Sequence, residues 1–142
     1  MRTKGWVVTL SLGLMLASAT ACHFSVTTAN LSALKLGKDK TVSQETSSFA
    51  ADDTVYAVAV VSNVPDKVKV KARLAFEDVP GQTAGPIPGL ETTLDLGGSG
   101  TGTFTFSPPN SGWPKGKYKV EVFMLDENGD QKDQKANSFT VS

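Results

Sequence analysis

Residues 67–77 read KVKVKARLAFE, and this stretch decides the fold. Apolar and charged side chains alternate along it, with Val68 and Leu74 on one face and Lys69 and Arg73 on the other. A period of two is typical of a β-strand with one buried face and one face in water. The stretch therefore predicts a half-buried strand in a sheet that packs one side against a core.

Similar short segments lie on both sides of this strand. Strands are expected at residues 31–36, 54–61, 92–96, 101–106, 117–125 and 137–141. Residues 54–61 are apolar at nearly every position, which predicts a central strand covered on both faces. Residues 41–51 are rich in Ser and Thr and are expected to form a long loop or an irregular edge segment. Seven short strands with turn signals between them predict an all-β, antiparallel sandwich.

Residues 114–118, Pro-Lys-Gly-Lys-Tyr, lie at the start of the sixth predicted strand. This pattern resembles the tyrosine corner of immunoglobulin-like and fibronectin-type domains, in which the Tyr hydroxyl bonds back to the preceding corner. The resemblance implies a seven-stranded immunoglobulin-like sandwich over residues 31–142, with Tyr118 as the corner residue. The cysteine pair and the third-strand Trp of antibody domains are missing. The resemblance is therefore to bacterial immunoglobulin-like modules, which usually lack both.

The first 21 residues have the three parts of a secretory signal peptide. Arg2 and Lys4 give a positive start, residues 6–16 form an uncharged apolar run, and residues 17–21 are small. The apolar run is shorter than the roughly 20 residues that span a bilayer. Residues 1–21 are therefore predicted to be removed during export. No later segment is long and apolar enough to predict a membrane span.

The tract Ala19-Thr20-Ala21-Cys22 resembles the lipobox of bacterial lipoproteins. In that family the cysteine thiol is diacylated and the chain is cut just before it. The resemblance implies a lipid on Cys22, a tether over residues 22–30 and the membrane as partner through two or three acyl chains, which hold firmly. Ala19 stands where the family usually has Leu. The same tract also fits ordinary signal peptidase, whose product would keep a free thiol.

His23 and Cys22 are the only histidine and the only cysteine of the chain. The domain after them therefore offers no Ser-His-Asp or Cys-His site and no zinc site of His and Cys ligands. It also carries no phosphate-binding or dinucleotide-binding glycine motif. We expect neither enzymatic activity nor a cofactor. The slight acidic excess left after removal of the signal gives no general attraction for nucleic acid.

The residue after the cysteine bears on localisation, again by resemblance to lipoproteins. In enterobacterial lipoproteins an Asp there retains the protein in the inner membrane, and here the residue is His23. The resemblance implies anchoring in the outer membrane of a Gram-negative cell, on its periplasmic side or at the surface. In other cells it implies the outer face of the plasma membrane.

Two sets of side chains are candidates for binding. The first is a basic row on the third and sixth strands, which are neighbours in such a sandwich: Lys67, Lys69, Lys71, Arg73, Lys117 and Lys119. This row is either a patch for an anionic partner or a charged, solvated face balanced by nearby acids. The second candidate is Trp113 in a proline-rich corner, which either stacks on a sugar ring or caps the core beside Tyr118.

Two loops carry no predicted site. Oxygen-bearing side chains at positions 126, 128 and 130 have the spacing of a calcium loop, but Gln131 stands where that loop needs Gly. Asn128-Gly129 instead predicts a hairpin turn, and no metal is expected. Residues 79–89 are rich in Pro and Gly and are expected to be a plain connector.

The sequence thus predicts a non-enzymatic, lipid-anchored module of the cell envelope, binding an envelope protein or polysaccharide. The alternative is a carbohydrate-binding module that uses Trp113 and the Pro-rich loop.

Overall fold

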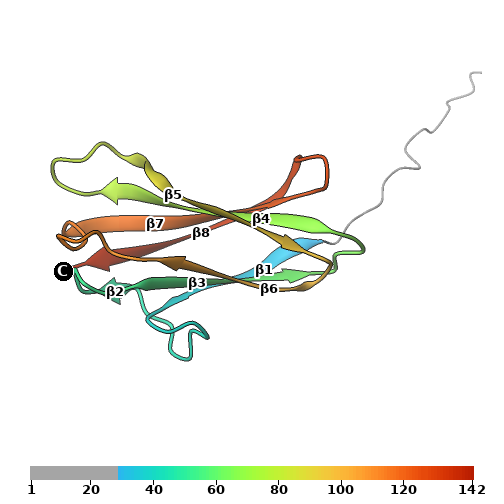
Figure 1. Cartoon of the computed structure of the whole chain (residues 1–142), viewed down its shortest axis with the longest axis horizontal. Coiled ribbons are helices and arrows are strands. Elements are labelled where there is room, and N and C mark those ends of the chain that lie inside the picture. The colour runs from blue at the N-terminus through green and yellow to red at the C-terminus, as the bar shows by residue number, and fades with distance from the viewer. Residues whose placement is uncertain (1–28) are drawn as a thin grey trace, which may run out of the picture.

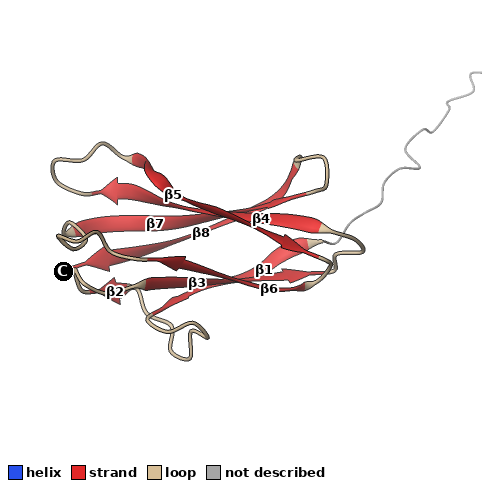
Figure 2. Ribbon diagram, viewed as in Figure 1, coloured by secondary structure: helices blue, strands red, loops and turns tan. Residues whose placement is uncertain are grey.

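The computed structural model describes residues 29–142, which fold into two facing sheets (Figure 1). Figure 2 shows that every regular element of this part of the chain is a strand. In chain order the strands are β1 Asn30–Gly37, β2 Ser48–Phe49, β3 Val55–Ser62, β4 Val68–Asp78, β5 Gly85–Leu96, β6 Gly100–Phe106, β7 Gly116–Leu125 and β8 Gln131–Val141. The predicted all-β class is confirmed here, whereas the predicted signal peptide and Cys22 lie outside the described residues.

The strand order is immunoglobulin-like. One sheet has the order β1-β3-β6 and the other has the order β2-β8-β7-β4-β5. In an immunoglobulin domain the first, second and fifth strands share one sheet, as β1, β3 and β6 do here. The third, sixth and seventh strands share the other sheet, as β4, β7 and β8 do here. The predicted neighbourhood of the third and sixth strands is therefore confirmed as the β4–β7 pair.

The structure corrects the predicted strand list in three places. The two-residue strand β2 makes eight strands rather than seven, and it pairs in parallel with β8, so the sandwich is not wholly antiparallel. Strand β5 begins at Gly85, inside the segment expected to be a connector, because an edge strand tolerates proline. Strand β8 begins at Gln131 rather than Asn137, since its first half is an exposed ladder whose polar side chains gave no apolar alternation.

The core fills the space between the two sheets. The alternation in β4 is confirmed, because Val68, Val70, Ala72 and Leu74 are all buried. Strand β3 is central, between β1 and β6, as predicted. However, it is covered on one face only: alternate residues from Val55 to Val61 are buried, whereas Tyr56 and Val60 stay partly exposed on the outer face. The prediction of a strand covered on both faces is therefore wrong.

The predicted tyrosine corner is present. The Tyr118 hydroxyl donates a hydrogen bond of 2.6 Å to the carbonyl of Pro114. The Tyr118 ring stacks on Phe139, with centroids 5.2 Å apart. Gly116 is required in this corner because its φ is 147° and a β-carbon there would lie 2.7 Å from the carbonyl oxygen of Asp78.

The two ends of the sandwich differ in what they carry. Figure 1 shows the start of β1 and the β7–β8 hairpin at one end, and the C-terminus at the other. At the first end the backbone N–H of Leu31 donates a 2.8 Å hydrogen bond to the Asp133 carboxylate, which ties β1 to β8. Within residues 29–142 no helix has the length and hydropathy needed to cross a bilayer.

Candidate functional site

The predicted basic row lies on the outer face of the five-stranded sheet. Lys69, Lys71 and Arg73 project from β4, and the cross-strand register places Arg73 opposite Glu121 and Ala75 opposite Lys119 of β7. On the other side of β4 the register places Arg73 opposite Glu91 of β5. We call this surface the charged face. It gathers the predicted cations on adjacent strands, but it also places acidic residues among them.

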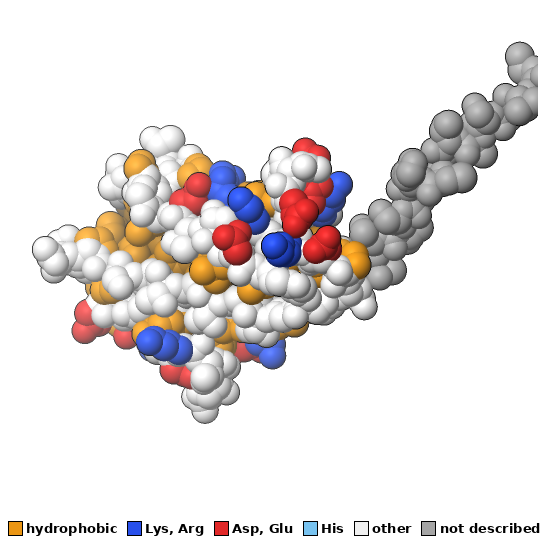
Figure 3. All heavy atoms as spheres, turned by 45° about the vertical axis from the view of Figure 1, so that its right-hand side comes forward, with side chains coloured by type: hydrophobic (Ala, Val, Ile, Leu, Met, Phe, Trp, Pro, Cys, Tyr) orange, Lys and Arg blue, Asp and Glu red, His pale blue; other side chains and the backbone are white. Residues whose placement is uncertain are grey.

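Ion pairs balance four of the six cations of the charged face. The nitrogen–oxygen distances are 2.9 Å for Arg73–Glu121, 3.1 Å for Lys71–Glu91, 3.6 Å for Lys117–Glu77 and 3.7 Å for Lys119–Glu121. On the side of the molecule drawn in Figure 3, blue and red side chains also lie close together, with no large field of one sign. The arrangement matches a solvated face balanced by acids, the second of the two readings of this row.

Glu121 lies at the centre of the charged face. It is 7% exposed, and its carboxylate contacts both Arg73 and Lys119. The guanidinium of Arg73 also lies over the ring of Phe123, with 4.8 Å from its carbon to the ring centroid. Such a contact adds a cation–π attraction to the ion pair. The contacts of Glu121 with Arg73 and of Arg73 with Phe123 therefore join strands β4 and β7.

Lys67 and Lys69 lie at the end of the sandwich where the β7–β8 hairpin is found. They line an open depression of about 420 Å³ together with Asp95 and Glu127. Two carboxylates among two ammonium groups leave this depression without a net field for an anion.

Trp113 is buried. It is 4% exposed, and its indole N–H donates a 2.8 Å hydrogen bond to the backbone carbonyl of Asp53. Its ring packs edge-on against Tyr118, with centroids 6.0 Å apart. The ring therefore caps the core, and it has no free face on which a sugar ring could stack. Of the two roles considered for Trp113, its position matches the core cap.

The acidic segment after β7 is a hairpin turn. The Asp126 carboxylate accepts hydrogen bonds of 2.9 Å from the backbone N–H groups of Asn128 and Asp130. These hydrogen bonds, the one from Asp130 above all, hold the pKa of Asp126 below its ordinary value. Lys132 lies 3.4 Å from the same carboxylate. The Asp126 carboxylate oxygens therefore accept hydrogen bonds within the turn. In a calcium loop such oxygens would point at the cation.

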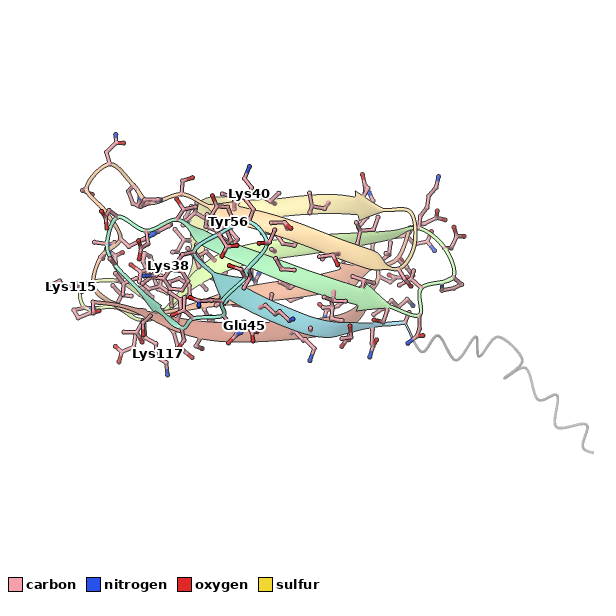
Figure 4. All side chains as sticks on the ribbon, turned by 90° about the horizontal axis from the view of Figure 1, so that it is seen from below. Lys38, Lys40, Glu45, Tyr56, Lys115 and Lys117 are labelled. Atoms are coloured by element: carbon pink, nitrogen blue, oxygen red, sulfur yellow. The ribbon has the colours of Figure 1, made fainter. Side chains whose placement is uncertain are left out.

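Sequence reasoning missed the outer face of the three-stranded sheet. The register aligns Tyr56, Val58 and Val60 of β3 with the alternate threonines of β6, which are Thr105, Thr103 and Thr101. The three threonines are exposed, and Tyr56 and Val60 are partly exposed. We call this surface the neutral face, and Figure 4 looks onto it, with Tyr56 labelled. The sequence signal for this surface is the apolar run of β3. A strand with one buried face needs an apolar residue only at every second position, and β3 has more than that.

Comparisons with known proteins give no family. No family model matches the chain, and no curated protein matches it. Among solved structures, an immunoglobulin-like protein from Pseudomonas aeruginosa is 13% identical, with a TM-score of 0.45 over 80% of this chain and 96% of the other. A Niemann-Pick type C2 protein from the Japanese carpenter ant is 11% identical, with a TM-score of 0.48 over 80% and 92%. A putative β-galactosidase from Bacteroides fragilis is 14% identical, with a TM-score of 0.47 over 78% of this chain but only 17% of the enzyme.

Proposed function

We propose that the chain is an exported, lipid-anchored module of the cell envelope that acts by binding rather than by catalysis. The anchor is the lipid on Cys22, at the end of the small-residue tract that follows the apolar run. Two observations support this arrangement. The cysteine is the only one of the chain, and strand β1 begins eight residues later, at one end of the sandwich.

The neutral face is the binding surface in this proposal. The observation that carries it is the outer side of β3, where Tyr56 and Val60 are partly exposed beside the threonines of β6, and where Lys35 is the one charged residue of β1 paired with β3. Aromatic residues are enriched at protein interfaces, and charged residues are depleted from interface cores. The charged face, by contrast, satisfies most of its charges internally. The partner is an envelope protein or an envelope polymer.

Mass spectrometry of the mature N-terminus tests the anchor. The expected result is a chain that begins at Cys22 and carries acyl chains, and that leaves the membrane fraction when Cys22→Ala is introduced. A mature N-terminus with an unmodified thiol would remove the anchor from the proposal. Because the substitution lies outside the sandwich, thermal unfolding of the Cys22→Ala chain provides the control for correct folding.

Site-specific photo-cross-linking in cells tests the binding surface. A photoreactive phenylalanine analogue replaces Tyr56 on the neutral face and, as the matched control, Phe123 on the charged face. Both positions are partly exposed aromatic residues within a strand. We expect a discrete adduct from position 56 that is weaker or absent from position 123. An adduct from position 123 alone would place the binding surface on the other sheet.

A further inference from the structure

Three of the four sheet edges are blocked against further strand pairing. The outward groups of β1 are engaged by other parts of the chain. Three hydrogen bonds do this: Leu31 N–H to Asp133, Asn137 side-chain N–H to Leu34 carbonyl, and Thr46 N–H to Leu36 carbonyl. The short β2, on the same side of the other sheet, offers two residues only.

Strand β5 is blocked in a different way, by prolines and a bulge in its first half and by the charged residues Glu91 and Asp95 in its second half. It contains Pro86 and Pro88, which have no N–H to donate. Its pairing with β4 is also interrupted, since Arg73 lies opposite Glu91 and Ala75 lies opposite Pro86. Four residues of β5 therefore bulge where β4 has one. Prolines, bulges and short strands are the devices by which natural sheets avoid edge pairing.

Strand β6 has none of these devices. Its seven residues, Gly-Thr-Gly-Thr-Phe-Thr-Phe, include no charge and no proline. Its register with β3 is unbroken from Gly100 to Phe106. Within residues 29–142 no backbone hydrogen bond joins β6 to any strand other than β3. Alternate N–H and C=O groups along its whole length therefore point outward, ready to accept another strand.

We propose that β6 is the interface between two copies of this chain, paired antiparallel about a two-fold axis at Thr103. The sequence of β6 is self-complementary about that residue. In this register Thr101 lies opposite Thr105 of the second copy, and Gly102 lies opposite Phe104. Threonine pairs across strands are stabilising, and no like charges meet. A glycine opposite each ring leaves room for it. The paired sheets become one six-stranded sheet with the neutral face continuous across it.

A second copy fits this edge better than an unlimited chain of copies. Two-fold pairing uses the same strand on both partners, so each copy closes the open edge of the other. Because the remaining edges are blocked, the assembly stops at two. The two-fold axis reverses the second copy, so the first strands of the two copies begin at opposite ends of the pair. This inference does not depend on the lipid at Cys22.

Disulfide trapping tests the register. The full chain with Cys22→Ala has no thiol of its own, and single cysteines are then introduced on the exposed side of β6. Thr103→Cys lies opposite itself at the axis, so mild oxidation is expected to link it into a dimer. Thr101→Cys is the matched control: the two copies of this residue are about 13 Å apart along the strand, too far to link. Thr101→Cys is expected to link only to Thr105→Cys when the two chains are mixed.

Equilibrium sedimentation tests the interface without cross-linking. Thr103→Lys places two ammonium groups opposite each other and is expected to weaken the dimer at least tenfold. Gln134→Lys adds the same charge at an exposed position of β8, in the other sheet, and is expected to leave the dimer unchanged. The inference is overturned by a chain that stays monomeric up to about 1 mM, by a dimer indifferent to Thr103→Lys, or by equal linking of Thr101→Cys and Thr103→Cys. A monomer that pairs with an extended peptide would assign β6 to a different protein.

Discussion

The hydroxyl of Tyr118 reaches back four residues and donates its proton to the carbonyl of Pro114, at 2.6 Å. Both groups lie where the polypeptide turns from the corner into β7. The tyrosine is fully buried, and burial raises the pKa of its hydroxyl. A pKa raised above 10.0 keeps the hydroxyl a neutral donor at neutral pH. This one contact joins the turn to the aromatic core.

Tyr118→Phe removes this donor and keeps the ring. We expect a loss of about 1 kcal/mol in the free energy of unfolding, because a hydrogen bond from the buried Tyr118 hydroxyl is lost. Thermal unfolding followed by circular dichroism should show a Tm lower by several degrees. Tyr56→Phe, on the neutral face, is the matched control and should change the Tm little. Equal effects of the two substitutions would contradict a special role for the corner.

Gly116→Ala adds one methyl group where the backbone of Asp78 and Val79 approaches most closely. We expect a loss of more than about 2 kcal/mol, since the new carbon clashes with rigid backbone and φ is 147°. Gly81→Ala is the control: its φ is also positive, at 81°, but no atom lies within 4 Å of the added carbon. Chemical denaturation should give a clearly larger free energy of unfolding for Gly81→Ala than for Gly116→Ala.

Glu121→Gln removes the charge that Arg73 and Lys119 share. We expect a loss of about 1–3 kcal/mol, because the largely buried acceptor of a charged hydrogen bond is weakened. Glu91→Gln, which breaks the more exposed pair with Lys71, should cost less than about 1 kcal/mol. The two free energies of unfolding can be compared at low and high salt. Similar losses for the two variants would show that burial at Glu121 does not matter.

Asp53 predicts a pH dependence of stability. Its carboxylate accepts a 2.7 Å hydrogen bond from the N–H of Ala50, and this bond, with the contact to Lys38, lowers its pKa from 3.8. A carboxyl group whose pKa is lower in the folded state than in the unfolded state stabilises the fold at pH values above its unfolded-state pKa. This stabilisation is lost as the pH falls through the folded-state pKa. Asp53→Asn should therefore lower the Tm at neutral pH, and the difference should shrink below about pH 3. A difference independent of pH would point to the lost packing rather than the charge.

Much of this fold was predictable because its strands obey a simple period. The alternation of β4 and the Pro-x-Gly-x-Tyr pattern before β7 identified the sheet partners and the corner correctly. The exposed first half of β8 and the proline-bearing first part of β5, residues 85–91, were missed because neither has an apolar alternation. Their place is set by long-range pairing with β7 and β4, which local sequence does not contain.

The candidate sites were less predictable than the fold. The sequence placed five of the six cations correctly on neighbouring strands, with Lys67 just before β4, but their partner acids include residues distant in the chain, such as Glu91 and Glu121. The burial of Trp113 depends on the loop around Asp53, sixty residues earlier. The exposed side of β3 was not predictable from the sequence, because the apolar run does not show that the outer face of β3 has no layer packed over it.

The position of β8 has a consequence for when the domain can form. This last strand of the chain lies between β2 and β7 and supplies Phe139 and Val141 to the core. A polypeptide that emerges N-terminus first therefore lacks a central piece of its larger sheet until residues 131–141 arrive. Loop closure over such distances is slow. A chain threaded through a membrane in the direction we propose would thus lack this strand of its larger sheet until residues 131–141 have crossed.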